Sequence, residues 1–163
     1  NELSHLVSAA ISGGLEPRHL TLELQHLGGQ NRLPDADAKA IAALRKKGVR
    51  LSLDRFGSTT SVAHLRMLKC DEIKIDASLA QDLDDATNQA MLLGIGDFAR
   101  RLSLACIACG VDTASRLAFL KKNGWQQGQG RHFGEPLGAV AFAAQWLSRT
   151  GKPQRAEVSS GFL

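Results

Sequence analysis

Two carboxylates and one lysine could carry out chemistry in this chain. Glu23, Asp54 and Lys74 each stand on the polar side of a short segment in which aliphatic and polar residues alternate. A pair of carboxylates beside an ammonium group suits divalent-metal and phosphate chemistry. In a folded interior, however, these charges are costly unless they pair with one another, with a metal ion or with a ligand.

The segments that carry these charges are predicted to be strands. Around Asp54 and around Lys74, the aliphatic residues share one face of the segment and the charged residues share the other. A helical connection joins the two segments, so they should be parallel neighbours whose aliphatic faces turn toward covering helices. The leucines around Glu23 follow the same pattern. We therefore expect Glu23, Asp54 and Lys74 to face one shared interior at the carboxyl ends of the strands, where sites of parallel α/β folds lie.

The whole chain repeats one strand-and-helix unit. Strands are predicted at 20–25, 49–54, 72–76, 104–108 and 126–129. Helices are predicted at 2–12, 35–47, 61–68, 88–102, 114–123 and 139–148. This rhythm indicates an α/β fold with a parallel sheet and right-handed crossovers. Five strands are too few for a closed (β/α)8 barrel, so either the sheet is open or the chain is the later part of a barrel whose first units are missing.

Composition excludes several functional classes. The chain has 163 residues, 44% of them hydrophobic, and a formal net charge of +4. Its basic pairs fall late in predicted helices without an aromatic series beside them, so we expect no nucleic-acid binding. No apolar run approaches a membrane span and no signal-peptide pattern opens the chain, so we expect a cytoplasmic domain, alone or within a membrane-tethered protein. Residues 1–150 are the predicted domain, and the small, polar residues 151–163 a flexible tail.

The three cysteines, Cys70, Cys106 and Cys109, are predicted to be buried, reduced thiols. Cys106 and Cys109 form a C-x-x-C pair, but the pair lies along a predicted strand and not at the head of a helix, where redox motifs lie. No second cysteine pair exists to complete a zinc site.

Five motifs follow one another in an order that resembles a known family. They are LEL around Glu23, the D-x-F-G at 54–57, the KID at 74–76, the G-V-D-T at 110–113 and the QG that precedes Pro136. Together they resemble the EAL domain, the cyclic di-GMP phosphodiesterase domain of bacterial signalling, from about residue 15 to residue 136. The resemblance implies a TIM-barrel-like (β/α)8 fold that binds cyclic di-GMP across its C-terminal mouth. Only the later five or so units are present here, so the barrel is incomplete at its N-terminal side.

The resemblance also implies roles for individual residues. Glu23 and Asp54 match metal-binding carboxylates, and Lys74 matches the lysine near the attacking water. In active members, carboxylates and an asparagine hold two divalent ions that activate this water. The predicted ligand-binding residues that match the motifs are Asp54, Lys74, Asp112, Gln129 and Gly130. To these we add Arg55, because a guanidinium pairs well with a phosphate, and Phe133, as an aromatic platform for a guanine near the barrel mouth.

Several departures from the family pattern argue against hydrolysis. Arg55 replaces the second aspartate of D-D-F-G, His26 replaces the second glutamate of the first motif, and Cys109 replaces a glutamate. Two neighbouring divalent ions need several anionic ligands, and a guanidinium is the wrong charge for this role. We therefore expect no catalytic residues beyond the remnants Glu23, Asp54 and Lys74. A metal site built on Glu23 and Asp54 would be incomplete, so Mg²⁺ is not required and would bind weakly.

Three functions remain open on these residues. The first is a catalytically inactive EAL-like receptor or regulatory module for cyclic di-GMP. The second is a protein–protein interaction module that no longer binds nucleotide, in which Glu23 and Asp54 form a structural ion network with Lys74 or Arg55. The third is a weak Mg²⁺-dependent phosphodiesterase that needs the missing strands. We further expect a protein partner or upstream signalling domains, and an incomplete barrel has open sheet edges that invite self-association.

Overall fold

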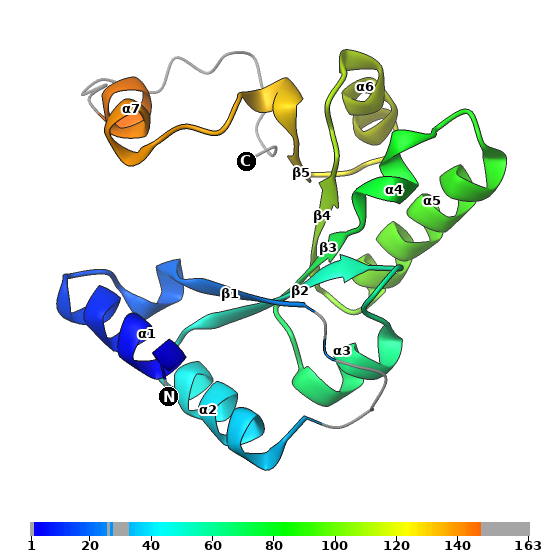
Figure 1. The fold of residues 1–163 in the computed structure, drawn as a ribbon. Helices are drawn as coiled ribbons and strands as arrows, with labels where there is room; N and C mark the ends of the chain where they lie inside the picture. The colour runs from blue at the N-terminus through cyan, green and yellow to red at the C-terminus, as the bar shows by residue number, and fades with distance from the viewer. Residues whose placement is uncertain (1, 26, 28–32, 148–163) are drawn as a thin grey trace.

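Five parallel strands form one twisted sheet in the order β1-β2-β3-β4-β5 (Figure 1). The structure is a computed structural model that describes residues 2–25, 27 and 33–147. Its strands are β1 Thr21–Leu24, β2 Arg50–Phe56, β3 Glu72–Ile75, β4 Ala105–Cys109 and β5 Gln127–Gln129. All five predicted strands are confirmed, and each neighbouring pair is parallel as expected.

Helices connect the strands and cover one face of the sheet. The longer ones are α1 Glu2–Ser12, α2 Asp35–Lys46, α3 Val62–Leu68, α5 Ala86–Arg101 and α6 Ala114–Lys122. Shorter elements are α4 Ala77–Gln81, α7 Ala139–Phe142, the 3-10 turns η1 Pro17–His19 and η2 Arg131–Phe133, and the π-helical turn η3 Ala143–Leu147. In Figure 1, α7 stands apart from α5 and α6.

Two helix predictions were wrong in part. The helix predicted at 88–102 begins earlier, at Ala86, because the Asp85 carboxylate accepts a hydrogen bond from the Asn88 backbone N–H at 2.9 Å and caps the helix. The predicted helix 139–148 is α-helical only to Phe142 and continues as η3, and its last predicted residue lies outside the described residues. The short helix α4 was not predicted, because five residues are too few to establish a helical periodicity.

The core lies between the sheet and the helices. Leu51, Leu53 and Ile73 are completely buried, and so are Leu92 of α5 and Leu120 of α6, which pack in the same hydrophobic cluster. Successive residues of a strand point to opposite faces, so burying these aliphatic residues directs the polar ones to the second face. This confirms the predicted alternation.

A β-bulge in β2 changes where Arg55 points. The register runs from Leu53 opposite Ile73 to Phe56 opposite Ile75, so β2 has one residue more than β3 over this stretch. Strict alternation would direct Arg55 toward the helices, where Phe56 packs instead with 4% of its surface exposed. Arg55 takes a left-handed backbone conformation with φ of 54°, which costs a non-glycine residue about 1–2 kcal/mol. The bulge therefore brings Arg55 to the polar side of the sheet.

Two histidines and one tryptophan have structural positions. His64 is buried and its Nδ1 accepts a hydrogen bond from the Ser61 backbone N–H at 3.2 Å, as part of the cap of α3. His132 is exposed and Trp125 belongs to the core. His26 and the predicted tail lie outside the described residues.

The described helices include none that is both long enough and apolar enough to span a bilayer. The three cysteines are free thiols, as predicted; Cys70 is buried, whereas Cys106 and Cys109 are partly buried.

Replacing Gly130 with alanine should destabilise the fold. A Cβ atom at this position would lie 2.2 Å from the Val111 carbonyl oxygen, which is a backbone atom that cannot rotate away. We expect Gly130→Ala to lower the free energy of unfolding by about 2 kcal/mol or more, measured by urea denaturation. The matched control is Gly94→Ala, because nothing lies within 4 Å of a Cβ there. Equal unfolding midpoints for wild type and Gly130→Ala would contradict this close approach.

Candidate functional site

Lys74 and Glu23 form an ion pair across the polar face of the sheet. The Lys74 Nζ donates to Glu23 Oε1 at 2.8 Å, and only 7% of the lysine side chain is exposed, against 44% for the glutamate. Burial alone would lower the pKa of Lys74, but the hydrogen bond and negative charge of Glu23 outweigh it and hold this pKa above its usual value. Lys74 is therefore a protonated, compensated cation.

Arg55 and Asp76 form a second pair next to the first. The Arg55 Nε donates to Asp76 Oδ2 at 3.1 Å, and the Ser58 hydroxyl donates to the same oxygen at 2.6 Å. The other oxygen, Oδ1, accepts the Ser78 backbone N–H at 2.9 Å and thereby caps α4. Burial would raise the pKa of Asp76, but the hydrogen bonds from Ser58, Ser78 and Arg55 hold it far below its usual value.

Asp54 is held by its own loop. Its Oδ1 accepts the Arg55 backbone N–H at 2.9 Å, and its backbone carbonyl accepts the Thr60 hydroxyl at 2.8 Å. These bonds fix the turn that follows β2 and orient Asp54 and Arg55 together.

A cavity of about 390 Å³ lies at the carboxyl ends of β2, β3 and β4. It is lined by Asp54, Arg55, Ile75, Asp76, Ala77, Ser78, Gln81 and Cys109. The Cys109 thiol contributes no negative charge here, because burial raises its pKa to about 11 against the opposing effect of Lys74. The structure thus brings the predicted residues Asp54 and Arg55 to one cavity, and places the pair of Glu23 and Lys74 on the same sheet face.

The other predicted ligand residues do not line this cavity, and their ligand role stays a prediction. Asp112 accepts the Arg131 backbone N–H at 2.9 Å and lies 3.7 Å from the Arg116 guanidinium. Phe133 packs against the hydrophobic core, and Gly130 lies tightly against the backbone of Val111. Gln129 lies opposite Cys109 in the sheet.

Sequence reasoning missed Asp76, Ser78 and Gln81, which line the cavity. The first of them carried a signal, because an aspartate directly after a strand is a common helix N-cap. The pairing of Asp76 with Arg55 carried none, since it depends on the bulge in β2.

Among the described residues, the carboxylates do not fit a two-metal centre. No group of three or more His, Cys, Asp or Glu side chains in these parts of the chain is arranged to hold a metal ion. Glu23 and Asp76 are each paired with a cation, so each would have to give up its partner to coordinate a metal. Asp54 is the remaining carboxylate of the cavity.

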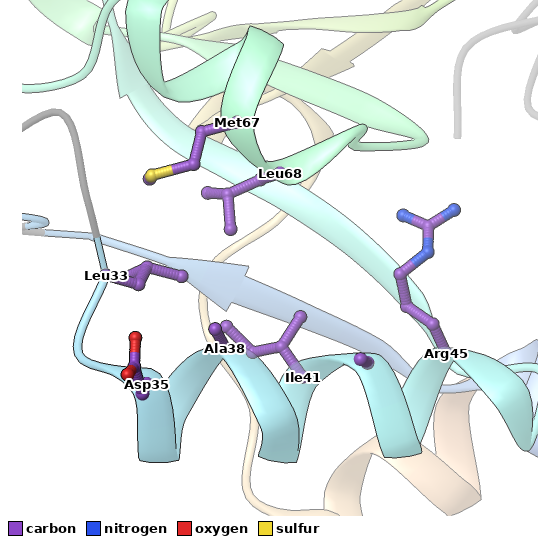
Figure 2. A pocket seen from close by; sticks show the side chains of 8 residues that line it. Leu33, Asp35, Ala38, Ile41, Arg45, Met67 and Leu68 are labelled. Carbon is purple, nitrogen blue, oxygen red and sulfur yellow. The ribbon is translucent and has the colours of Figure 1, made fainter.

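A second cavity, of about 290 Å³, lies between α2 and α3 (Figure 2). Leu33, Ile41, Met67 and Leu68 face one another across it. The Arg45 guanidinium contacts Asp71 at 3.3 Å and the Lys69 carbonyl, and so ties α2 to the loop before β3. Among the described residues, no set of polar side chains converges in this second cavity. We therefore interpret it as a gap in the packing between α2 and α3 and not as a ligand site.

Comparison with known families and proteins gives consistent matches. The family described as EAL domain matches residues 2–136. The bifunctional diguanylate cyclase/cyclic di-GMP phosphodiesterase MucR of Pseudomonas aeruginosa is 34% identical over 144 residues, which cover 84% of this chain and 20% of MucR. The cyclic di-GMP phosphodiesterase PdeR of Escherichia coli is 36% identical over 111 residues, covering 67% of this chain and 17% of PdeR. The chain thus spans about a fifth of the length of these relatives.

Two solved structures with similar folds contain the nucleotide. The Pseudomonas aeruginosa MucR phosphodiesterase in complex with c-di-GMP superimposes with a TM-score of 0.70 at 32% identity, covering 83% of this chain and 55% of that one. The Klebsiella pneumoniae BlrP1 complex with manganese and cyclic di-GMP gives a TM-score of 0.69 at 27% identity, covering 78% of this chain and 33% of that one. The five-stranded sheet is therefore part of a TIM-barrel-like fold.

Replacing Asp76 with asparagine tests the buried pair without removing the helix cap. The folded-state pKa of Asp76 lies below its unfolded value, so its ionised form contributes stability at neutral pH that is lost as the pH falls below about 4. We expect Asp76→Asn to cost about 1.5–3 kcal/mol at pH 7 and the difference from wild type to shrink steadily below pH 4. Urea denaturation across this pH range measures both. A cost that is the same at pH 3 and pH 7 would show that the charge of Asp76 is not what stabilises the pair.

Proposed function

Because the chain belongs to the EAL domain family, we propose that it is a non-hydrolysing EAL domain that binds cyclic di-GMP as a receptor or regulatory module. The named relatives act on this nucleotide, and two similar structures contain it. The part of the proposal that goes beyond the family is that binding remains while hydrolysis is lost.

The observation that carries the proposal is the position of Arg55. Its guanidinium forms an ion pair with Asp76 in the cavity, at the motif position where the resemblance places an aspartate. A fixed positive charge at this position repels a divalent cation. The ion pair also makes the Asp76 carboxylate unavailable as a metal ligand. Substituting arginine for aspartate changes the local charge by two units, and a single lost ligand already costs orders of magnitude in rate in enzymes whose groups act together.

The same guanidinium supports phosphate binding. A guanidinium has five N–H donors, and the pair with Asp76 uses the one on Nε. The Arg55 side chain is 47% exposed at the cavity, so its Nη groups are available to a phosphate. The left-handed backbone of Arg55 costs energy, and such strain is concentrated at functional sites.

Metal-assisted hydrolysis would need donors that the described residues do not supply. In related structures manganese accompanies cyclic di-GMP. Among the described residues, Asp54 is the cavity carboxylate that forms no ion pair, and the neutral thiol of Cys109 adds no charge. A metal bound here would act as a Lewis acid on the phosphate, but one carboxylate does not hold two such ions.

A second candidate function is protein–protein interaction without nucleotide. It is favoured by the charge balance of the site, where three carboxylates, Glu23, Asp54 and Asp76, face two cations, Arg55 and Lys74. Both cations are already compensated, so a phosphate would bring its charge to a group of residues that already carries one negative charge in excess. Self-association and partner binding through the sheet edges belong to this candidate.

Calorimetric titration of the intact protein with cyclic di-GMP, with Mg²⁺ and with EDTA, separates these functions when the nucleotide is analysed afterwards by chromatography. We expect binding of equal strength in both buffers and recovery of intact nucleotide. The variant Arg55→Asn removes the guanidinium but tolerates the left-handed backbone, so it should weaken binding by about 10- to 100-fold.

The matched control for this experiment is Arg101→Asn, which removes the same charge from the exposed last turn of α5. Absence of any binding heat in wild type would overturn the receptor and favour the interaction module. Linear dinucleotide product would overturn the loss of hydrolysis.

A further inference from the structure

One arginine, Arg116, does not line the cavity but links two segments that lie beside it. Arg116 lies in the first turn of α6, and its side chain is mostly buried, with 21% exposed. Its Nη1 donates to the Gly110 carbonyl at 3.1 Å and its Nη2 donates to the Gln81 carbonyl at 2.8 Å. Arg116 thus bridges the end of α4 to the turn after β4, and its partner in α4 lies 35 residues earlier in the sequence.

The segment that Arg116 holds forms most of the cavity wall. Five of the eight lining residues come from the end of β3 and from α4, namely Ile75, Asp76, Ala77, Ser78 and Gln81. At the start of this segment, the Asp76 side chain caps α4. At its end, the Gln81 carbonyl accepts the hydrogen bond from Arg116. Because a helix of five residues has little stability of its own, α4 depends on these contacts at its two ends.

The turn at Gly110 packs closely against α4, which forms this wall of the cavity. A Cβ atom at Gly110 would lie 2.9 Å from the Ala77 Cβ, and the backbone φ of 78° is left-handed. Since Arg116 binds the Gly110 carbonyl, it fixes the turn that contacts the beginning of α4 as well as the carbonyl at its end. Asp112 holds the guanidinium in place from 3.7 Å and receives the Arg131 backbone N–H from the next turn.

We propose that Arg116 is a positioning residue that fixes the α4 wall of the Arg55 cavity and so controls access to it, through the Gly110 and Gln81 carbonyls and with the support of Asp112. The position of the α4 wall depends only on these contacts, whereas an effect on nucleotide affinity rests on the proposed function.

The cavity contains its own reporter of access, the Cys109 thiol. Alkylation of the intact protein with N-ethylmaleimide, followed residue by residue by peptide mass spectrometry, measures how strongly the α4 wall shields this partly buried thiol. Arg116→Met keeps the length of the side chain but removes all of its donors. We expect it to accelerate labelling of Cys109 at least about fivefold, the factor that about 1 kcal/mol of lost local stability gives, and to accelerate amide exchange over residues 77–82.

Two controls show whether the effect is local. Cys70 is buried elsewhere, in the hydrophobic core, so its labelling rate should not change. Arg66→Met removes the same charge from an exposed position on α3 and should leave Cys109 labelling at the wild-type rate. Arg116→Lys keeps the charge but has a single terminal amine in place of the two Nη groups, so it should restore protection only in part.

Unchanged Cys109 labelling in Arg116→Met would overturn the proposal, and so would equal acceleration of Cys70, which would indicate global destabilisation. Where wild type binds cyclic di-GMP, Arg116→Met should weaken binding about tenfold, and unchanged affinity would overturn the control of access. Failure of wild type to bind the nucleotide counts against the proposed function alone, because the labelling experiment needs no ligand.

Discussion

The pairing of charges on the polar face of the sheet is the interaction on which the site depends. Alternation in parallel strands forces Glu23, Asp54 and Lys74 onto one face as soon as their aliphatic neighbours are buried against the helices. Charges in this position must be compensated, and the chain does so internally by pairing Lys74 with Glu23 and Arg55 with Asp76. In the function that we propose, these internal ion pairs occupy carboxylates that metal ions would need. The loss of hydrolysis that we propose is therefore a consequence of how the fold balances its own buried charge.

Much of this arrangement could be predicted from the sequence, since the relevant signals are local. Alternation around Glu23, Asp54 and Lys74 predicts the strands, and the helical connections predict their parallel order. The contact between Glu23 and Lys74 follows from a shared face, because the long side chains of β1 and β3 reach each other across β2, where the small Ser52 lies opposite Glu23. The short β5 was equally accessible to this reasoning.

The rest depended on geometry that the sequence pattern does not contain. The extra residue in β2 moves Arg55 out of the strict alternation, so its partner Asp76 could not be derived from periodicity. The role of Arg116 depends on two backbone carbonyls, which have no side-chain signature. Asp112 combines both kinds of information. Its motif position implies a ligand contact, which stays a prediction, and the structure adds that its carboxylate accepts the Arg131 backbone N–H and lies beside the Arg116 guanidinium.

Anomalous diffraction from crystals of the intact protein, grown with cyclic di-GMP and Mn²⁺, tests the central claim most directly. It reports the number and position of bound metal ions independently of any assay of turnover. Our account predicts a phosphate of the nucleotide against the Arg55 guanidinium, with no pair of manganese ions between Asp54 and the phosphate. Two manganese peaks about 4 Å apart, bridged by a water over this cavity, would contradict it.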